Sequence, residues 1–204
     1  MRILKAAALL TAVAILSASA ADKVGYLNMD TLFTSYYKTV NANISFEQKK
    51  REVDDRMGVL RSGIEEIVRE LKKLEAEAQN ELLADSVREE ALKKYRTRAD
   101  IFGQKREEFE RARQESLQEL RRIQVDTEAL LVGELTKLVK SHAAANGFTH
   151  IVDISGQSMN RIPFLLVYPE KDEITQALVA LANQGHEKEL EESKAKLEEL
   201  RNRK

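Results

Sequence analysis

An uninterrupted repeat of apolar residues at spacings of four and three is the longest regular pattern in the chain. Its eight members are Val53, Met57, Leu60, Ile64, Ile67, Leu71, Leu74 and Ala78. This spacing predicts a heptad seam along one face of a helix. Because a stripe this narrow stays in contact with water unless a second helix covers it, the pattern also predicts a partner helix.

The partner helix is expected after a break at residues 83–86. Ser86 and Glu89 have the spacing of a capping box, and Asp85 is a competing cap. Beyond the break, a seven-residue repeat runs through Tyr95, Phe102, Phe109, Ser116, Ile123 and Leu130, and the helical pattern continues to about residue 145. The short break predicts an antiparallel helical hairpin over residues 46–145, with its tip near 84–86 and a length of roughly 60 Å.

Short β-strands are expected on both sides of the hairpin, at 23–29, 148–154 and 162–168. The residues assigned to them are Val24, Tyr26, Leu27, Ile151, Val152, Ile154, Phe164, Leu165 and Val167. Asp30 and Asp172 are the predicted caps of two short helices, and Gly147 is expected to end the second arm in the left-handed conformation. Residues 21–45 and 146–184 therefore form one discontinuous body. The predicted fold is mainly α-helical with a small β base.

The predicted body has roughly 65 residues, a size at which one core supplies only a few kcal/mol. A three-stranded sheet leaves two open edges, which pair readily with another chain. We therefore expect oligomerisation through these edges, and the pattern leaves the number of subunits open. Residues 185–204 follow as a charged tail whose thin stripe is formed by Leu190, Leu197 and Leu200.

Residues 1–20 have the pattern of a cleavable signal peptide. Arg2 and Lys5 precede an apolar run over 6–16, and Ala18-Ser19-Ala20 fits a small-x-small cleavage site. Cleavage is expected after Ala20, with export to the periplasm. A retained membrane anchor is the alternative, but eleven apolar residues are too few to span a bilayer about 30 Å thick.

The charge of the chain argues against a dedicated nucleic-acid binder. Without the first twenty residues, 31 basic and 34 acidic side chains remain, a net charge of −3. Nucleic-acid binding domains are normally strongly basic. The chain also has no cysteine, so it takes no stability from disulfides or thiolate metal sites.

Candidate chemistry is sparse. His142, His150 and His186 are scattered, and the nearest thing to a metal-ligand pair, His150 with Asp153, has no third partner in the sequence. The sequence contains no glycine-rich phosphate loop, no Gly-x-Ser-x-Gly elbow and no cysteine nucleophile. An enzyme is therefore the least expected class, and no cofactor or metal is predicted.

Two features of the hairpin have both a functional and a structural interpretation. Six basic residues should share one band near the tip if residue i faces roughly residue 169 − i: Lys72, Lys73, Lys93, Lys94, Arg96 and Arg98. The band is either a site for anionic lipid, lipopolysaccharide or an acidic client, or a solvated helix face diluted by neighbouring glutamates. Gly63 and Gly103 should lie within one turn of the same level, where they are either a hinge or two tolerated glycines.

The ends of the mature chain resemble those of one known family. The start ADKVGYLNMDTLF, the segment FTHIVDIS after Gly147 and the closing YPEKDEITQAL resemble the Skp/OmpH family of periplasmic chaperones, up to about residue 182. The resemblance implies a jellyfish-shaped homotrimer, in which strands of three chains close a small barrel and three hairpins enclose a cavity. Unfolded outer-membrane proteins would be held there without ATP. This chain departs from the family in its slightly acidic charge and in its additional tail.

A competing hypothesis is a structural envelope adaptor or spacer that docks one fixed partner. An adaptor should have a tight seam and a localised apolar patch near the tip. Instead the second arm places Arg98, Lys105 and Arg113 in or beside slots that should be apolar, and apolar residues near the tip are few. The sequence therefore favours the chaperone.

Overall fold

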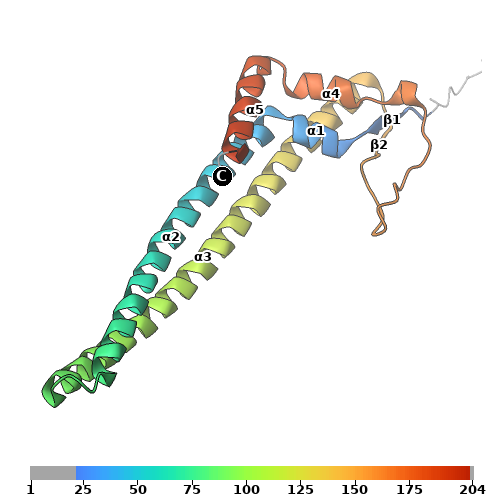
Figure 1. Ribbon diagram of the computed structural model, residues 1–204. Coiled ribbons are helices and arrows are strands. Elements are labelled where there is room, and N and C mark those ends of the chain that lie inside the picture. The colour runs from blue at the N-terminus through green and yellow to red at the C-terminus, as the bar shows by residue number, and fades with distance from the viewer. Residues whose placement is uncertain (1–21, 203–204) are drawn as a thin grey trace, which may run out of the picture.

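The computed structural model describes residues 22–202 and shows a long helical hairpin that projects from a small body (Figure 1). The elements along the chain are β1 (Val24–Leu27), α1 (Met29–Ser35), α2 (Tyr37–Gln79), α3 (Asp85–Asn146), β2 (His150–Asp153), the 3-10 helix η1 (Glu170–Asp172), α4 (Thr175–Ala182) and α5 (Glu187–Asn202). α2 and α3 are the two arms, and the other elements gather at one end of them. The predicted mainly helical fold with a small sheet is confirmed. The predicted signal peptide lies outside the described residues.

The core of the body is assembled from both ends of the chain and the root of α3. Seven buried residues form it: Leu27, Leu32, Tyr36, Leu131, Leu135, Ile174 and Leu178. Leu32 and Leu178 are fully buried, and Leu135 is nearly so. Because α3 supplies two core leucines, the arm is continuous with the body rather than attached to its surface.

Two of the predicted helix caps are wrong. α1 is capped by Asn28, whose Oδ1 accepts a hydrogen bond from the Thr31 amide (2.8 Å), so that Asp30 lies in the first turn. The short helix near the end begins at Thr175 after a 3-10 turn, and Asp172 belongs to that turn instead of capping α4. At the other arm end, Gly147 caps α3 with φ 69°, as predicted.

The hairpin turn is wider than predicted. α2 ends at Gln79, four residues before the expected break, and Asn80 Oδ1 accepts from the Leu82 amide (3.0 Å). α3 begins at Asp85, and its N-cap, Ala84, makes no side-chain capping bond. The Ser86–Glu89 capping box therefore does not form, because the helix has already started when the chain reaches Ser86.

The heptad seam of α2 is confirmed, since all eight predicted residues are buried or half-buried. On α3 the seven-residue repeat holds as far as Ile123 and then fails at Leu130, which is 63% exposed. Leu131 takes its place and is 4% exposed. A straight α-helix drifts about 20° per heptad, so over five heptads a strict seven-residue repeat rotates off the contact face.

The C-terminal segment forms a regular helix, α5, which lies along the root of α2 (Figure 1). The predicted leucine stripe faces α2: Leu190 and Leu197 are buried against Val40 and Ile44, and Leu200 packs beside them. Among residues 22–202, no helix combines the length and apolar character needed to cross a membrane.

Candidate functional site

The small sheet has one covered and one open edge. β1 and β2 pair in parallel, with Tyr26 opposite Val152. The outer edge of β1 is covered, because the Ile174 amide donates to the Tyr26 carbonyl oxygen (2.8 Å). Within the described chain no named strand pairs with the outer edge of β2, where Val152 is 36% exposed. β2 therefore presents an edge that can accept a further strand.

Six of the nine predicted strand residues lie at this sheet. Val24, Tyr26 and Leu27 are in β1 and Ile151 and Val152 in β2, while Ile154 follows β2 and donates its amide to the Leu27 carbonyl oxygen (2.9 Å). Both strands are shorter than the predicted 23–29 and 148–154. Leu27 faces the core of the body and is 3% exposed, so it is not available to a partner chain.

The predicted third strand does not form within the single chain. Residues 162–167 belong to an irregular loop whose only ladder contact in the described chain is an isolated bridge between Gln157 and Pro163. The loop carries a group of exposed apolar side chains, which we call the apolar loop: Met159, Ile162, Phe164, Leu166 and Val167, with exposures of 54% to 103%. The segment is held to residues 156–158 by the Phe164 amide, which donates to the Gly156 carbonyl oxygen (3.0 Å), and by the Ile162 carbonyl oxygen, which accepts from the Ser158 amide (2.8 Å). This short turn does not continue into a ladder of regular strand bonds.

The two arms are joined by polar pairs where the seam lacks apolar residues. From root to tip these are Lys38–Glu134 (2.8 Å), Lys49–Glu119 (3.1 Å), Arg56–Ser116 and Arg98–Glu70 (2.6 Å). Their positions agree within a turn with the predicted facing of residue i and residue 169 − i. Hydrogen bonds and ion pairs thus join the arms at intervals along a seam in which, as the sequence predicted, the second arm lacks a full set of apolar residues.

The root pair is the most strongly perturbed electrostatically. Glu134 Oε2 accepts from Lys38 Nζ (2.8 Å) and from the Tyr36 hydroxyl (3.1 Å). The hydrogen bond from Lys38 is the largest cause that lowers the pKa of Glu134, and the same bond raises the pKa of Lys38. Burial, followed by the bond to Glu134, raises the pKa of Tyr36. These three groups fasten the start of α2 to α3.

The six residues of the predicted basic band lie on the outer arm, but acids neutralise half of them. Lys73 pairs with Glu77 (3.9 Å), Lys94 with Glu90 (2.7 Å) and Arg98 with Glu70 (2.6 Å), while Lys72, Lys93 and Arg96 are exposed. A groove of about 870 Å³ between the arms is lined by both signs of charge. Its mixed lining offers no purely basic surface to an anion.

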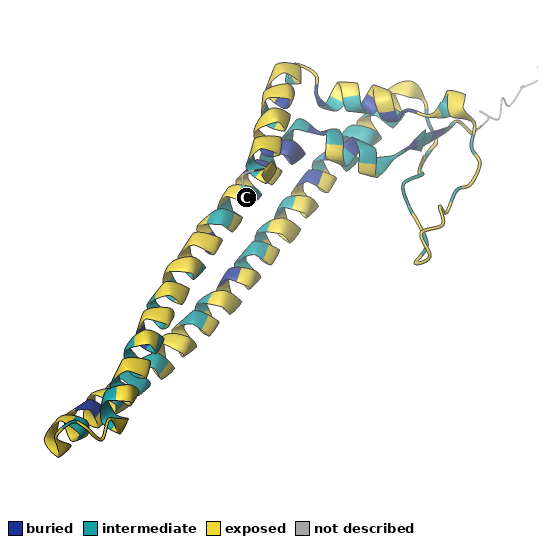
Figure 2. Cartoon of the chain, in the orientation of Figure 1, coloured by how far each residue is buried: buried dark blue, intermediate teal, exposed yellow. Residues whose placement is uncertain are grey.

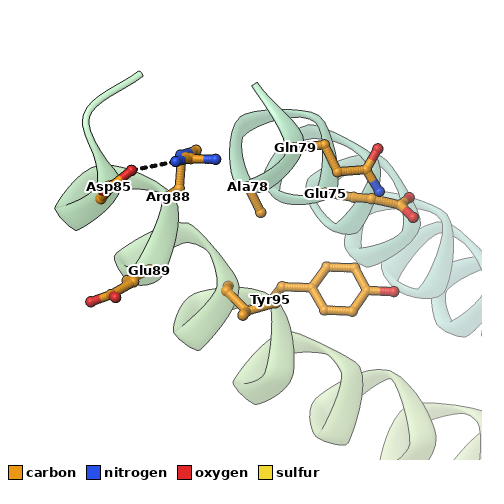
Figure 3. A pocket seen from close by; sticks show the side chains of 8 residues that line it. Glu75, Ala78, Gln79, Asp85, Arg88, Glu89 and Tyr95 are labelled. Carbon is orange, nitrogen blue, oxygen red and sulfur yellow. Dashed lines mark hydrogen bonds and ion pairs between the residues drawn. The ribbon is translucent and has the colours of Figure 1, made fainter. Parts of the chain in front are cut away.

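Exposed apolar side chains occur both at the tip and along the arms. At the tip Leu82 is 95% exposed, Val87 46% and Leu92 43%. Along the arms the exposed fraction is 74% at Val59 and 63% at Leu130, and Figure 2 shows that both arms are exposed along most of their length. The groove at the tip, of about 530 Å³, includes Tyr95 and Ala78 among charged residues, and Arg88 bonds to Asp85 one turn away on the same helix (Figure 3). The hairpin therefore offers many small apolar contacts and no single large patch.

The two candidate hinge glycines lie in unbroken helices. An added Cβ would meet nothing within 4 Å at either Gly63 or Gly103. Six consecutive residues of α3, 103–108, are exposed, so this level of the arm contributes no buried side chain. The hinge itself stays a prediction.

The histidines serve structural contacts. His142 stacks at 6.2 Å on Phe148, and Asp153 Oδ1 accepts from the amides of Met29 (3.1 Å) and Ser155 (2.8 Å). His186 stacks on Tyr37 with ring centroids 3.9 Å apart, a contact between the tail and α2 that the sequence did not indicate. No group of three acidic, histidine or cysteine side chains in residues 22–202 is placed to hold a metal ion.

A protein family model matches most of this chain. The search of curated proteins found no match to this chain. The family model described as "Outer membrane protein (OmpH-like)" matches residues 23–181, which include both strands, both arms and nearly all of α4, but not α5. The chain therefore belongs to the OmpH-like family.

Proposed function

We propose that this protein is an ATP-independent periplasmic holdase that binds unfolded outer-membrane β-barrel proteins and prevents their aggregation in transit. Membership of the OmpH-like family supports an outer-membrane-protein chaperone in general. The observation that carries the specific mechanism is the distribution of exposed apolar residues along a slender, mostly charged hairpin. Many weak apolar contacts suit an unfolded chain of no fixed shape, because each contact is small and none demands a particular partner sequence.

Features of the body favour association with further copies, and we propose that the assembly is a homotrimer. The open edge of β2 and the apolar loop lie in the same body; within residues 22–202 no strand pairs with that edge, and the five apolar side chains of the loop stay exposed. Pairing the loop of one copy with the β2 edge of the next would satisfy both, because backbone hydrogen bonds would form while the exposed apolar side chains become buried. Three copies joined in this way would bring three hairpins around one cavity for the client.

An aggregation assay tests the function. An outer-membrane β-barrel protein is unfolded in urea and diluted into buffer containing the mature chain without nucleotide, while light scattering is followed. A small molar excess should suppress scattering, and the suppression should change little between low and high salt, because the mature net charge is only −3. Full aggregation at low salt would contradict the holdase and favour an adaptor with one fixed partner.

A further inference from the structure

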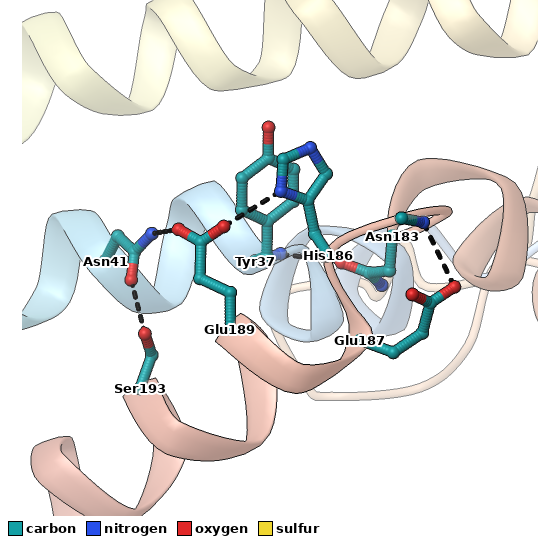
Figure 4. A network of polar contacts seen from close by, with 8 residues as sticks. Tyr37, Asn41, Asn183, His186, Glu187, Glu189 and Ser193 are labelled. Carbon is teal, nitrogen blue, oxygen red and sulfur yellow. Dashed lines mark hydrogen bonds and ion pairs between the residues drawn. The ribbon is translucent and has the colours of Figure 1, made fainter.

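The tail beyond the family match doubles back onto the arm. After α4, the chain turns at residues 183–186, where Gly185 has φ 80°, and α5 then runs along the first turns of α2 (Figure 4). A side chain at φ 80° would be strained, so this turn depends on glycine. Because of this turn, α5, which lies outside the matched residues 23–181, contacts the base of the hairpin.

One buried side chain of this turn spans the junction between body and arm. α1 and α2 are separated by the extended residue Tyr36, with ψ 129°, which leaves backbone groups on both sides without helical partners. The Asn183 Nδ2 donates to the carbonyl oxygen of Ser35 (3.0 Å), and its Oδ1 accepts from the amide of Tyr37 (2.8 Å). Asn183 is 5% exposed. It therefore bridges the last residue of α1 and the first residue of α2.

A chain of polar contacts then fixes α5 to α2. His186 stacks face to face on Tyr37, and its Nδ1 lies 2.8 Å from Glu189 Oε2. Asn41 Nδ2 donates to Glu189 Oε1 (2.7 Å), and Ser193 Oγ donates to Asn41 Oδ1 (2.6 Å), as Figure 4 shows. These contacts alternate between the two helices over more than one turn.

Apolar and terminal contacts extend the attachment to the far end of α5. Leu190 and Leu197 are 9% and 8% exposed where they pack on Val40 and Ile44. The Arg51 guanidinium donates to the carbonyl oxygen of Leu200, two residues before the end of α5 at Asn202. α5 is thus held to α2 at its start, its middle and its end.

We propose that residues 183–202 form an intramolecular brace that holds the root of α2 against the body and limits the motion of the hairpin about Tyr36. α3 enters the body as a continuous helix, whereas α2 meets α1 through a single extended residue. α2 is therefore the arm whose root needs a second support. If the protein is a holdase as proposed above, the brace also limits how widely its client cavity opens.

Distances between two spin labels test the brace without any client. Because the natural chain has no cysteine, cysteines introduced at Ala84 at the tip and Ala180 in α4 can be labelled selectively, and an excess of unlabelled chain isolates distances within one molecule. Two variants release α5: deletion of residues 187–204, and Leu190→Asp with Leu197→Asp in the full chain. The matched control is Lys188→Ala with Glu192→Ala, because these side chains are 93% and 69% exposed on the same helix.

The natural chain and the control should give the same distribution of Ala84–Ala180 distances, and both releasing variants should broaden it at least twofold. A second label pair, at Lys194 and Gln48, reports whether α5 has left α2. An unchanged Ala84–Ala180 distribution in a variant with released α5 would overturn the brace. The brace would also be overturned if the Lys194–Gln48 labels show that α5 stays on α2 in the Asp variant and the deletion variant leaves the Ala84–Ala180 distribution unchanged. Neither result depends on chaperone activity, so failure of the brace and failure of the proposed function are distinguishable.

Discussion

Replacing Gly63 and Gly103 together with alanine tests whether the arms bend at one level. Both glycines lie in helix interiors, and an added Cβ at either position meets open space within 4 Å. Nothing in the structure therefore opposes the change. Each glycine costs roughly 0.5–1 kcal/mol relative to alanine in a helix interior, so the double variant should gain about 1–2 kcal/mol.

A matched control separates flexibility from stability. Gly58 and Gly133 lie in the same two helices and also face open space, but they stand far from each other along the hairpin. Gly58→Ala with Gly133→Ala should give a similar gain in the urea unfolding midpoint. Only the change at Gly63 and Gly103 should stiffen the hairpin, because Gly103 begins the exposed segment 103–108 and Gly63 is predicted to face it from α2.

The assay is the distribution of distances between spin labels at Ala84 and Ala180, measured with and without a large unfolded client. The Gly63→Ala, Gly103→Ala variant should narrow the distribution and hold large clients less well than small ones. If both glycine pairs narrow it equally, general helix stiffness and not a hinge explains the result. If neither pair of substitutions narrows the distribution, Gly63 and Gly103 are glycines that the coiled coil tolerates and do not form a hinge.

Four further outcomes are expected. Leu178→Ala should destabilise the body by about 2–5 kcal/mol in urea unfolding, because this core side chain is fully buried. Val152→Pro should break the β1–β2 ladder within the chain and thereby dissociate the proposed trimer to monomer in sedimentation, because proline removes a ladder donor in the strand whose neighbouring amides, of His150 and Ile154, donate to the β1 side; a variant still trimeric at micromolar concentration would mean that the proposed interface does not need this strand. The pKa of Glu134 in the folded protein lies below 4.5, so the stability that its ion pair with Lys38 contributes is present above that pH and is lost as the pH falls through the lowered pKa. Glu134→Gln should remove this part of the acid sensitivity of unfolding. The effect should be at most about 1 kcal/mol, because the two side chains are about one-third exposed. Mass spectrometry of the exported protein should find Ala21 at its start; a retained Met1 would contradict cleavage.

The sequence predicted the hairpin because a long helix pair depends on local periodicity. The α2 seam is correct at every position, and the facing of the two arms is correct within a turn. The predictions from the sequence are wrong where a residue's place depends on helix geometry summed over many turns or on a single capping hydrogen bond. Leu131 replaces Leu130 because helical drift adds up over heptads, and Asn28 displaces Asp30 as a cap although both residue types are suitable.

The periodicity of the sequence could not predict which segments far apart in the chain contact each other. The stripe of Leu190, Leu197 and Leu200 predicted that the tail had an apolar face, but not that this face meets α2. Asn183 could not be identified as a bridge, since its two backbone partners lie near residue 36, almost 150 positions earlier. The third strand was predicted from its apolar and β-branched residues, and its absence from the single chain follows from the lack of a neighbouring strand.

The distribution of contacts along the hairpin places its freedom to bend in the middle of the arms. At the root, Lys38 and Tyr36 bind Glu134, and α5 packs on the first turns of α2. At the middle, residues 103–108 bury nothing and Gly63 and Gly103 weaken both helices at nearly one level. Motion localises where the fewest contacts must break. A braced root and a weak middle would therefore let the outer arms bow around a client while the body, and any oligomer built on it, stays unchanged.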